Sequence, residues 1–69
     1  MRAIIEATKA YKKLDTMQKL IYGKRASMLE IERQYRVAKS MGSEKWQKEF
    51  NPNRVHKAIV LELLNNDKL

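Results

Sequence analysis

The residues of this chain with the clearest chemical potential are cations, and seven of them lie within the first 25 positions. They are Arg2, Lys9, Lys12, Lys13, Lys19, Lys24 and Arg25. Two acids, Glu6 and Asp15, oppose them, so this third carries +5 of the chain's net charge of +7. Such an excess favours polyanionic partners. Because lysine ammonium groups bind phosphate as point charges, we expect nucleic-acid contacts through the backbone, with strong salt dependence and little sequence preference.

Two other interpretations of this basic surface stay open. A lysine-rich helix face is often only a solvated face. Ile5 and Leu20 lie in or beside it, and a basic amphipathic helix of this kind could also dock on an anionic membrane or an acidic protein. Insertion into a membrane is the less favoured version, because the opposite apolar stripe is needed for the core.

Catalytic and metal-binding chemistry has little support in the sequence. The chain has no cysteine and one histidine, His56, which stands between Arg54 and Lys57. Its two glycines, Gly23 and Gly42, cannot make a glycine-rich phosphate loop. We therefore expect a protein that is not an enzyme and that uses no cofactor and no metal.

The stretch VAKSMGSEKWQKEF, residues 37–50, resembles the first half of a DNA-reading helix-turn-helix. Ala38 and Gly42 suit the close approach and the turn. The second half fails, because of the inward positions only Phe50 holds a suitable residue, and the charges of the following helix sum to zero. We expect Gly42 to be an ordinary helix end, with Trp46 and Phe50 as core anchors.

The elements that must position these residues are helices. Residues 2–22 carry apolar groups at positions 4, 7, 11, 14 and 21, which predicts one core-facing helix, unless Asp15-Thr16 caps a second one. In that helix the cations lie opposite the stripe, with Tyr11 and Tyr22 on the apolar side. Ser27 and Glu30 form a capping-box pattern before a helix at 28–41, whose inner face holds Met28, Ile31, Tyr35, Ala38 and Met41. A short helix at 44–50 and a last helix at 53–65 follow, separated by Pro52.

The last helix is apolar nearly all round, which suits an enclosed helix. A chain of 69 residues has little material to enclose one, so we expect a dimer or higher oligomer formed through this helix. The alternatives are a compact monomer whose first two helices clasp the last one, or a buried strand at AIVLELL. The residues expected at an oligomer or partner interface are Tyr35, Trp46, Val55, Ile59, Val60, Leu63 and Leu64.

These patterns predict an all-α protein, a single domain over residues 1–69 with three to four short helices. We expect a small basic regulatory or accessory protein that binds DNA or RNA in the cytoplasm, with no transmembrane segment. The alternative function is a protein–protein adaptor or inhibitor, of the sort that phages and mobile elements encode.

Overall fold

A computed structural model of the chain describes residues 1–67, and within this range every element is a helix. The all-α prediction is confirmed, with six helices rather than three or four, and the strand considered for AIVLELL is wrong. The helices are α1 (Arg2–Glu6), α2 (Lys9–Lys12), α3 (Thr16–Tyr22), α4 (Arg25–Met41), α5 (Ser43–Phe50) and α6 (Arg54–Asp67).

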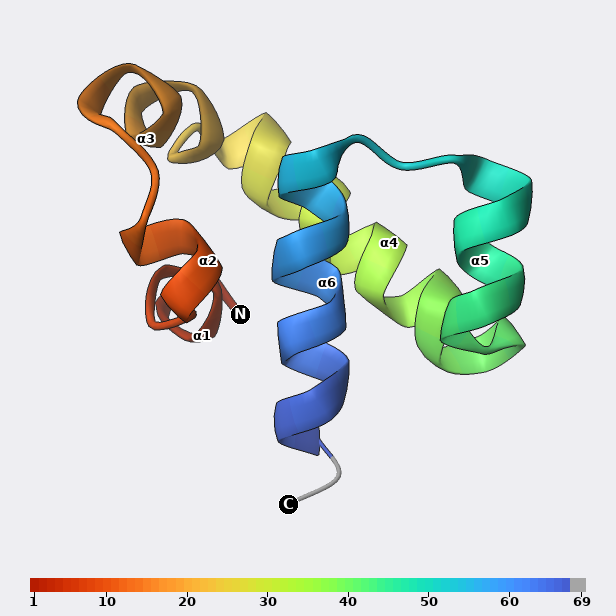
Figure 1. Cartoon of the computed structure of the whole chain (residues 1–69). Coiled ribbons are helices and arrows are strands. Elements are labelled where there is room, and N and C mark those ends of the chain that lie inside the picture. Colours follow the sequence, from red (N-terminus) through yellow and green to blue (C-terminus); the bar gives the residue numbers. More distant parts are fainter. Residues whose placement is uncertain (68–69) are drawn as a thin grey trace.

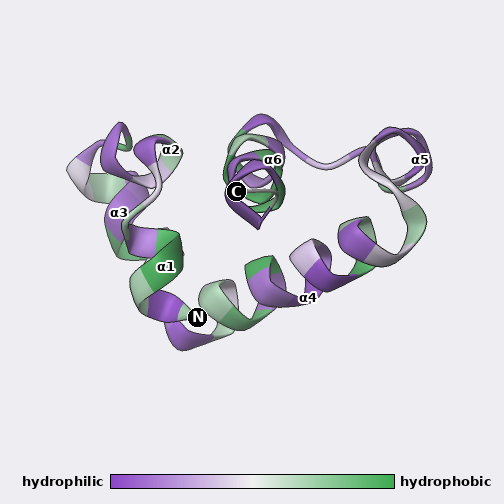
Figure 2. Cartoon of the chain, turned by 90° about the horizontal axis from the view of Figure 1, so that it is seen from below, coloured by the Kyte–Doolittle hydropathy of each residue, from purple (hydrophilic) through white to green (hydrophobic). Residues whose placement is uncertain are grey.

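The longest helix, α4, forms the base on which the other helices are arranged (Figures 1 and 2). The three short helices α1–α3 stand at one end of α4, and α5 folds back beside its other end. Helix α6 lies between these two groups and packs on α4, α2 and α1. The basic N-terminal third therefore occupies one end of the molecule.

The N-terminal third breaks into three helices because two side chains cap new helix starts. The Thr8 hydroxyl accepts a hydrogen bond from the Tyr11 amide at 3.1 Å and donates to the Ile5 carbonyl at 2.7 Å. Asp15 accepts from the Gln18 amide at 2.8 Å, and the Gln18 side chain accepts from the Asp15 amide at 3.2 Å. Such local bonds compete with continued helix. The single helix over 2–22 is thus wrong, and the alternative start at Asp15 is confirmed.

Helix α4 begins before the expected capping box. Lys24 has extended backbone angles and precedes the first helical residue, Arg25, so Ser27 already lies inside the helix. Its hydroxyl donates to the Ile21 carbonyl at 2.8 Å, and the Glu30 carboxylate pairs with Arg33. The predicted Ser27–Glu30 cap is therefore wrong, because the serine holds the preceding turn instead.

The remaining boundaries lie within two residues of the prediction. Gly42 ends α4 at φ 94° and ψ 142°, and α5 starts directly after it. Asn51 ends α5 in the left-handed conformation, at φ 43°. Helix α6 then follows Pro52 and Asn53.

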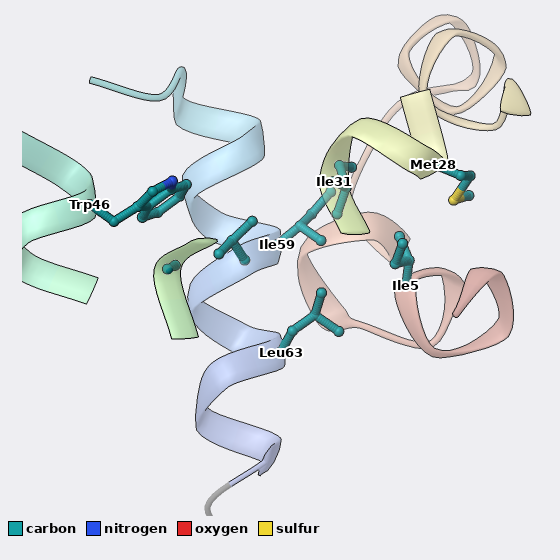
Figure 3. Packing of buried hydrophobic residues seen from close by; sticks show 8 residues of the cluster. Ile5, Met28, Ile31, Trp46, Ile59 and Leu63 are labelled. Atoms are coloured by element: carbon teal, nitrogen blue, oxygen red, sulfur yellow. The ribbon is translucent and has the colours of Figure 1, made fainter. Parts of the chain in front are cut away.

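The core is built around α6 (Figure 3). Ile59 and Leu63 of α6 lie between Trp46 of α5 on one side and Ile5 of α1 on the other. The buried apolar side chains are Ile5, Met28, Ile31, Ala38, Trp46, Ile59, Val60 and Leu63. The chain itself buries Ile59, Val60 and Leu63 of α6, while Val55, Leu61 and Leu64 are only partly buried. The expected oligomer stays a prediction.

Several exposures differ from those that periodicity predicted. Ile4 and Ile21 are exposed, whereas Ile5, expected beside the basic face, is fully buried. The predicted apolar stripe assumed one continuous helix. Because the helix breaks at Thr8, the residues after Thr8 do not continue the helical spacing of the residues before it. The prediction that Phe50 anchors the core is also wrong, since its side chain is 48% exposed. Trp46 is buried as expected.

Candidate nucleic-acid interface

The seven cations proposed as phosphate ligands are all exposed, but they do not share one helix face. The breaks at Thr8, Asp15 and Lys24 distribute them over four helices and two turns, so the arc predicted on a single helix is wrong. The helices α1, α2 and α3 carry Arg2, Lys9, Lys12 and Lys19, and the turns and the start of α4 carry Lys13, Lys24 and Arg25. What holds them together is the shared position of α1–α3 at one end of α4 (Figure 1).

Arg2 differs from the other six cations because it is already engaged. Its Nε forms an ion pair with Glu6 at 2.9 Å, and its guanidinium also donates to the Gly23 carbonyl. Arg2 thereby links α1 to the turn between α3 and α4, which is a structural role. The other six make no ion pair within residues 1–67, so their charges are free to meet a ligand.

Elsewhere in the described range the charges are close to balanced. In α4 the acids pair with neighbouring arginines, Glu30 with Arg33 at 2.8 Å and Glu32 with Arg36 at 2.5 Å. From residue 42 to residue 67 four cations face four acids: Lys45, Lys48, Arg54 and Lys57 against Glu44, Glu49, Glu62 and Asp67. The unbalanced positive charge is therefore concentrated at the α1–α3 end.

Glu62 of α6 fixes the position of α2, and the sequence analysis missed it. Its carboxylate accepts from the Lys9 amide at 2.6 Å and from the Ala10 amide at 3.0 Å. With Thr8 holding the Tyr11 amide, the first three amides of α2 all have side-chain partners. The positive end of the helix dipole at this N-terminus also attracts the negatively charged carboxylate. The available signal was a single acid inside the apolar run AIVLELL.

The two tyrosines near the basic surface pack inward, as predicted. Tyr11 and Tyr22 are half-buried against the core. The Tyr22 ring meets the ring of His56 edge-on, with centroids 5.2 Å apart and planes at 74°. Base-stacking platforms for single strands need exposed aromatic rings. This surface offers cations without such rings, which suits phosphate contacts rather than base stacking.

Four of the seven residues expected at an interface are buried in the chain's own core: Trp46, Ile59, Val60 and Leu63. The indole Nε1 of Trp46 donates to the Gln34 side chain at 2.8 Å, so its polar end is also satisfied within the chain. Side chains without exposed surface cannot contact a partner of the folded protein. Tyr35, Val55 and Leu64 remain partly exposed.

A groove of about 490 Å³ lies between the end of α4 and the C-terminal half of α6, with Leu61 and Leu64 on its wall. At its edge Asp67 pairs with Lys39 at 2.6 Å and accepts a hydrogen bond from the Tyr35 hydroxyl. These bonds, first that from Lys39, lower the pKa of Asp67, and the bond to Asp67 raises the pKa of Tyr35. The three side chains tie the end of α6 to α4.

His56 is half-buried at the start of α6. Burial lowers its pKa below the ordinary value of 6.5, and nearby Glu30 opposes this shift.

Across residues 1–67 no group of three or more histidine, aspartate or glutamate side chains is arranged to hold a metal ion. In the same range no helix combines the length and the apolar character needed to cross a bilayer.

The segment between α4 and α5 also shows why the helix-turn-helix pattern stops half-way. Gly42 joins the two helices, but Trp46 turns into the core and Phe50 remains outside. The charged residues of α5 are exposed, and its positive and negative charges are equal in number. This helix therefore has no net positive charge to attract the phosphates that line a DNA groove.

No family model matches the sequence, and neither a curated protein nor a solved structure matches it.

Proposed function

We propose that this chain binds nucleic acid through the phosphate backbone, using the cations of α1–α3 and of the turn at Lys24 and Arg25. The observation that carries the proposal is the charge distribution. Six exposed cations without ion pairs gather at one end, while residues 42–67 are balanced. The protein would act as a small regulatory or accessory factor without catalytic activity.

The chemistry of these residues sets the expected mode of binding. Lysine side chains are long and flexible, so they can follow phosphates along a strand or across a groove without a fixed docking angle. Neutralising each phosphate releases condensed counterions, which makes affinity fall steeply with salt. The inward packing of Tyr11 and Tyr22 supports binding with little preference for sequence.

The test is a fluorescence anisotropy titration of a labelled mixed-sequence duplex, a single strand and an RNA hairpin at 50 and 200 mM salt. One variant neutralises the α2 cluster, with Lys9, Lys12 and Lys13 changed to Gln. Its matched control changes Lys45, Lys48 and Lys57 to Gln, which removes the same charge from the balanced part of the chain.

We expect the α2 variant to weaken binding to every sequence and to lower the salt dependence. Three phosphate contacts account for a slope of up to about 3 in log affinity against log salt. The control should bind nearly as the original chain does, apart from a small uniform loss from its lower net charge. Equal losses in the two variants would show that net charge alone matters, and the assignment of this surface would fail.

A second candidate function is a protein–protein adaptor, and the groove beside α6 favours it. Leu61 and Leu64 are partly exposed there, next to the Lys39–Asp67 ion pair, so the groove offers both apolar and charged contacts. Capture of partners from a lysate on the immobilised chain, compared with capture on Leu64→Lys, tests this candidate. A captured protein that the variant also retains would not be bound through the groove.

A further inference from the structure

The outer face of α3 is apolar and exposed. Met17, Leu20 and Ile21 stand at positions i, i+3 and i+4 of this helix, so they lie on one side of it. Their exposed fractions are 68%, 66% and 49%. The helix packs against the core through Tyr22, on another side. Within residues 1–67 nothing buries these three aliphatic side chains.

The N-terminal part of the chain holds most of the large hydrophobic residues that are exposed within residues 1–67. Of the seven exposed large hydrophobic residues within residues 1–67, only Phe50 lies beyond position 29; the others are Met1, Ile4, Met17, Leu20, Ile21 and Leu29. The face of α3 is also flanked by cations along the chain. Lys13 precedes the helix, and Lys24 and Arg25 follow it, whereas Lys19 lies on the side of α3 opposite this face. Exposed apolar groups thus occur among unpaired positive charges.

Charge complementarity decides between the partners that could cover this face. A second copy would bring its own +5 to the contact, and the two like charges would repel each other. Nucleic acid would satisfy the cations but leave the aliphatic side chains in water. A protein hot spot favours aromatic residues and arginine, and the face of α3 has neither. An anionic bilayer provides phosphates for the cations and an apolar layer for the aliphatic groups.

We propose that the outer face of α3 docks on the surface of an anionic phospholipid bilayer. Met17, Leu20 and Ile21 enter the boundary between headgroups and acyl chains, and Lys13 and Lys24 contact headgroup phosphates. This is peripheral and reversible binding. The inference goes beyond the proposed nucleic-acid function, because it depends on three aliphatic residues that phosphate binding does not use.

The test is co-sedimentation of the full chain with vesicles of phosphatidylcholine containing about 30% phosphatidylserine, a content that gives the negative surface potential which attracts polybasic segments. Pure phosphatidylcholine vesicles are the lipid control. The variant changes Met17, Leu20 and Ile21 to Gln, and the matched control is Phe50→Gln, an exposed apolar residue at the end of α5. We expect binding to the anionic vesicles, a loss of at least about tenfold in the α3 variant and no loss in the control.

A second measurement keeps the test independent of variant stability. The chain has no cysteine, so Leu20→Cys and Lys45→Cys each give one site for an environment-sensitive fluorophore. The label at position 20 should shift to shorter wavelength when anionic vesicles are added, and the label at position 45 should not. Duplex binding by the α3 variant should equal that of the original chain, which separates this inference from the nucleic-acid proposal.

Three results would overturn the inference. The first is a lack of sedimentation with anionic vesicles at low salt. The second is equal vesicle binding by the original chain and the α3 variant, which would show attraction by charge alone. The third is a dimer in light scattering that the α3 variant dissolves, which would assign this face to a second copy.

Discussion

The Glu62 carboxylate is the contact whose removal tests the fold most sharply. It joins α6 to α2 by accepting from the amides of Lys9 and Ala10, at 2.6 and 3.0 Å. We predict that Glu62→Gln destabilises the protein, because the substitution keeps the size of the side chain but places an NH₂ group where one oxygen accepted. One hydrogen bond is then lost, and the other loses its charge.

The magnitude follows from these two bonds. A hydrogen bond to a charged group contributes about 1.5–3 kcal/mol and a neutral one about 1 kcal/mol. Losing one and weakening the other gives about 2–5 kcal/mol. The site is partly exposed, so we take the lower end of this range, about 2 kcal/mol. A chain of 69 residues is expected to have a total stability of only about 3–10 kcal/mol. The melting temperature should therefore fall by about 8–16 °C.

The assay is urea unfolding at pH 7, followed by helical circular dichroism and by the fluorescence of Trp46, the only tryptophan. Glu49→Gln is the control, since Glu49 is an exposed acid of α5 without an ion pair in residues 1–67. It should change stability by less than about 0.5 kcal/mol. If Glu62→Gln were equally mild, or if hydrogen exchange at the Lys9 and Ala10 amides did not accelerate, the capping role would be refuted.

Three further predictions concern the core, a turn and pH. Trp46→Ala should cost about 3–5 kcal/mol in urea unfolding and Phe50→Ala less than about 1 kcal/mol, because only Trp46 is buried; similar costs would contradict the packing. Gly42→Ala should lower the melting temperature through backbone strain of about 1–3 kcal/mol at φ 94°, since its Cβ would meet open space; an unchanged melt would argue against this turn. Burial lowers the pKa of His56, so the free energy of unfolding should be full above pH 6.5 and fall as the pH drops through the pKa of His56 in the folded protein. His56→Gln should flatten this pH dependence between pH 7.5 and 5. An equally steep decline in the variant would exclude His56 as the source of the pH dependence.

The parts of the fold that the sequence predicted well are those with a long regular pattern. In α4 the expected inner face of Met28, Ile31 and Ala38 is buried, with Tyr35 and Met41 packed beside it. Seventeen residues give a periodicity enough turns to define one side of a helix. In α6 the chain buries Ile59, Val60 and Leu63, but Leu61 and Leu64 stay partly exposed, so full enclosure of this helix is not observed.

The predictions that were wrong concern residues whose role depends on a particular local or long-range contact. Thr8 was one polar residue in a pattern that also fitted continuous helix, and its hydroxyl ends α1 and starts α2. Trp46 and Phe50 occupy the same face by spacing, but only one of them finds space in the core. Glu62 bonds to amides more than 50 residues away, so its role depends on how α2 docks against α6.

In the candidate site, too, some features could be predicted from the sequence and others depend on the fold. Composition located the basic third of the chain, and all seven cations are exposed, but their role in binding stays a prediction. The sequence could not show that Arg2 is bound to Glu6 and to the Gly23 carbonyl, because that contact needs the turn between α3 and α4 to lie beside α1. Nor could it show that the apolar face of α3 points outward.

The most direct test of the central claim is the salt dependence of duplex binding for the original chain and for the variant with Lys9, Lys12 and Lys13 changed to Gln. Six free cations predict a slope of up to about 5 in log affinity against log salt, falling toward about 3 in the variant. The variant with Lys45, Lys48 and Lys57 changed to Gln should retain the original slope. A lack of binding at 50 mM salt, or the same slope in all three proteins, would contradict a phosphate-binding surface on α1–α3.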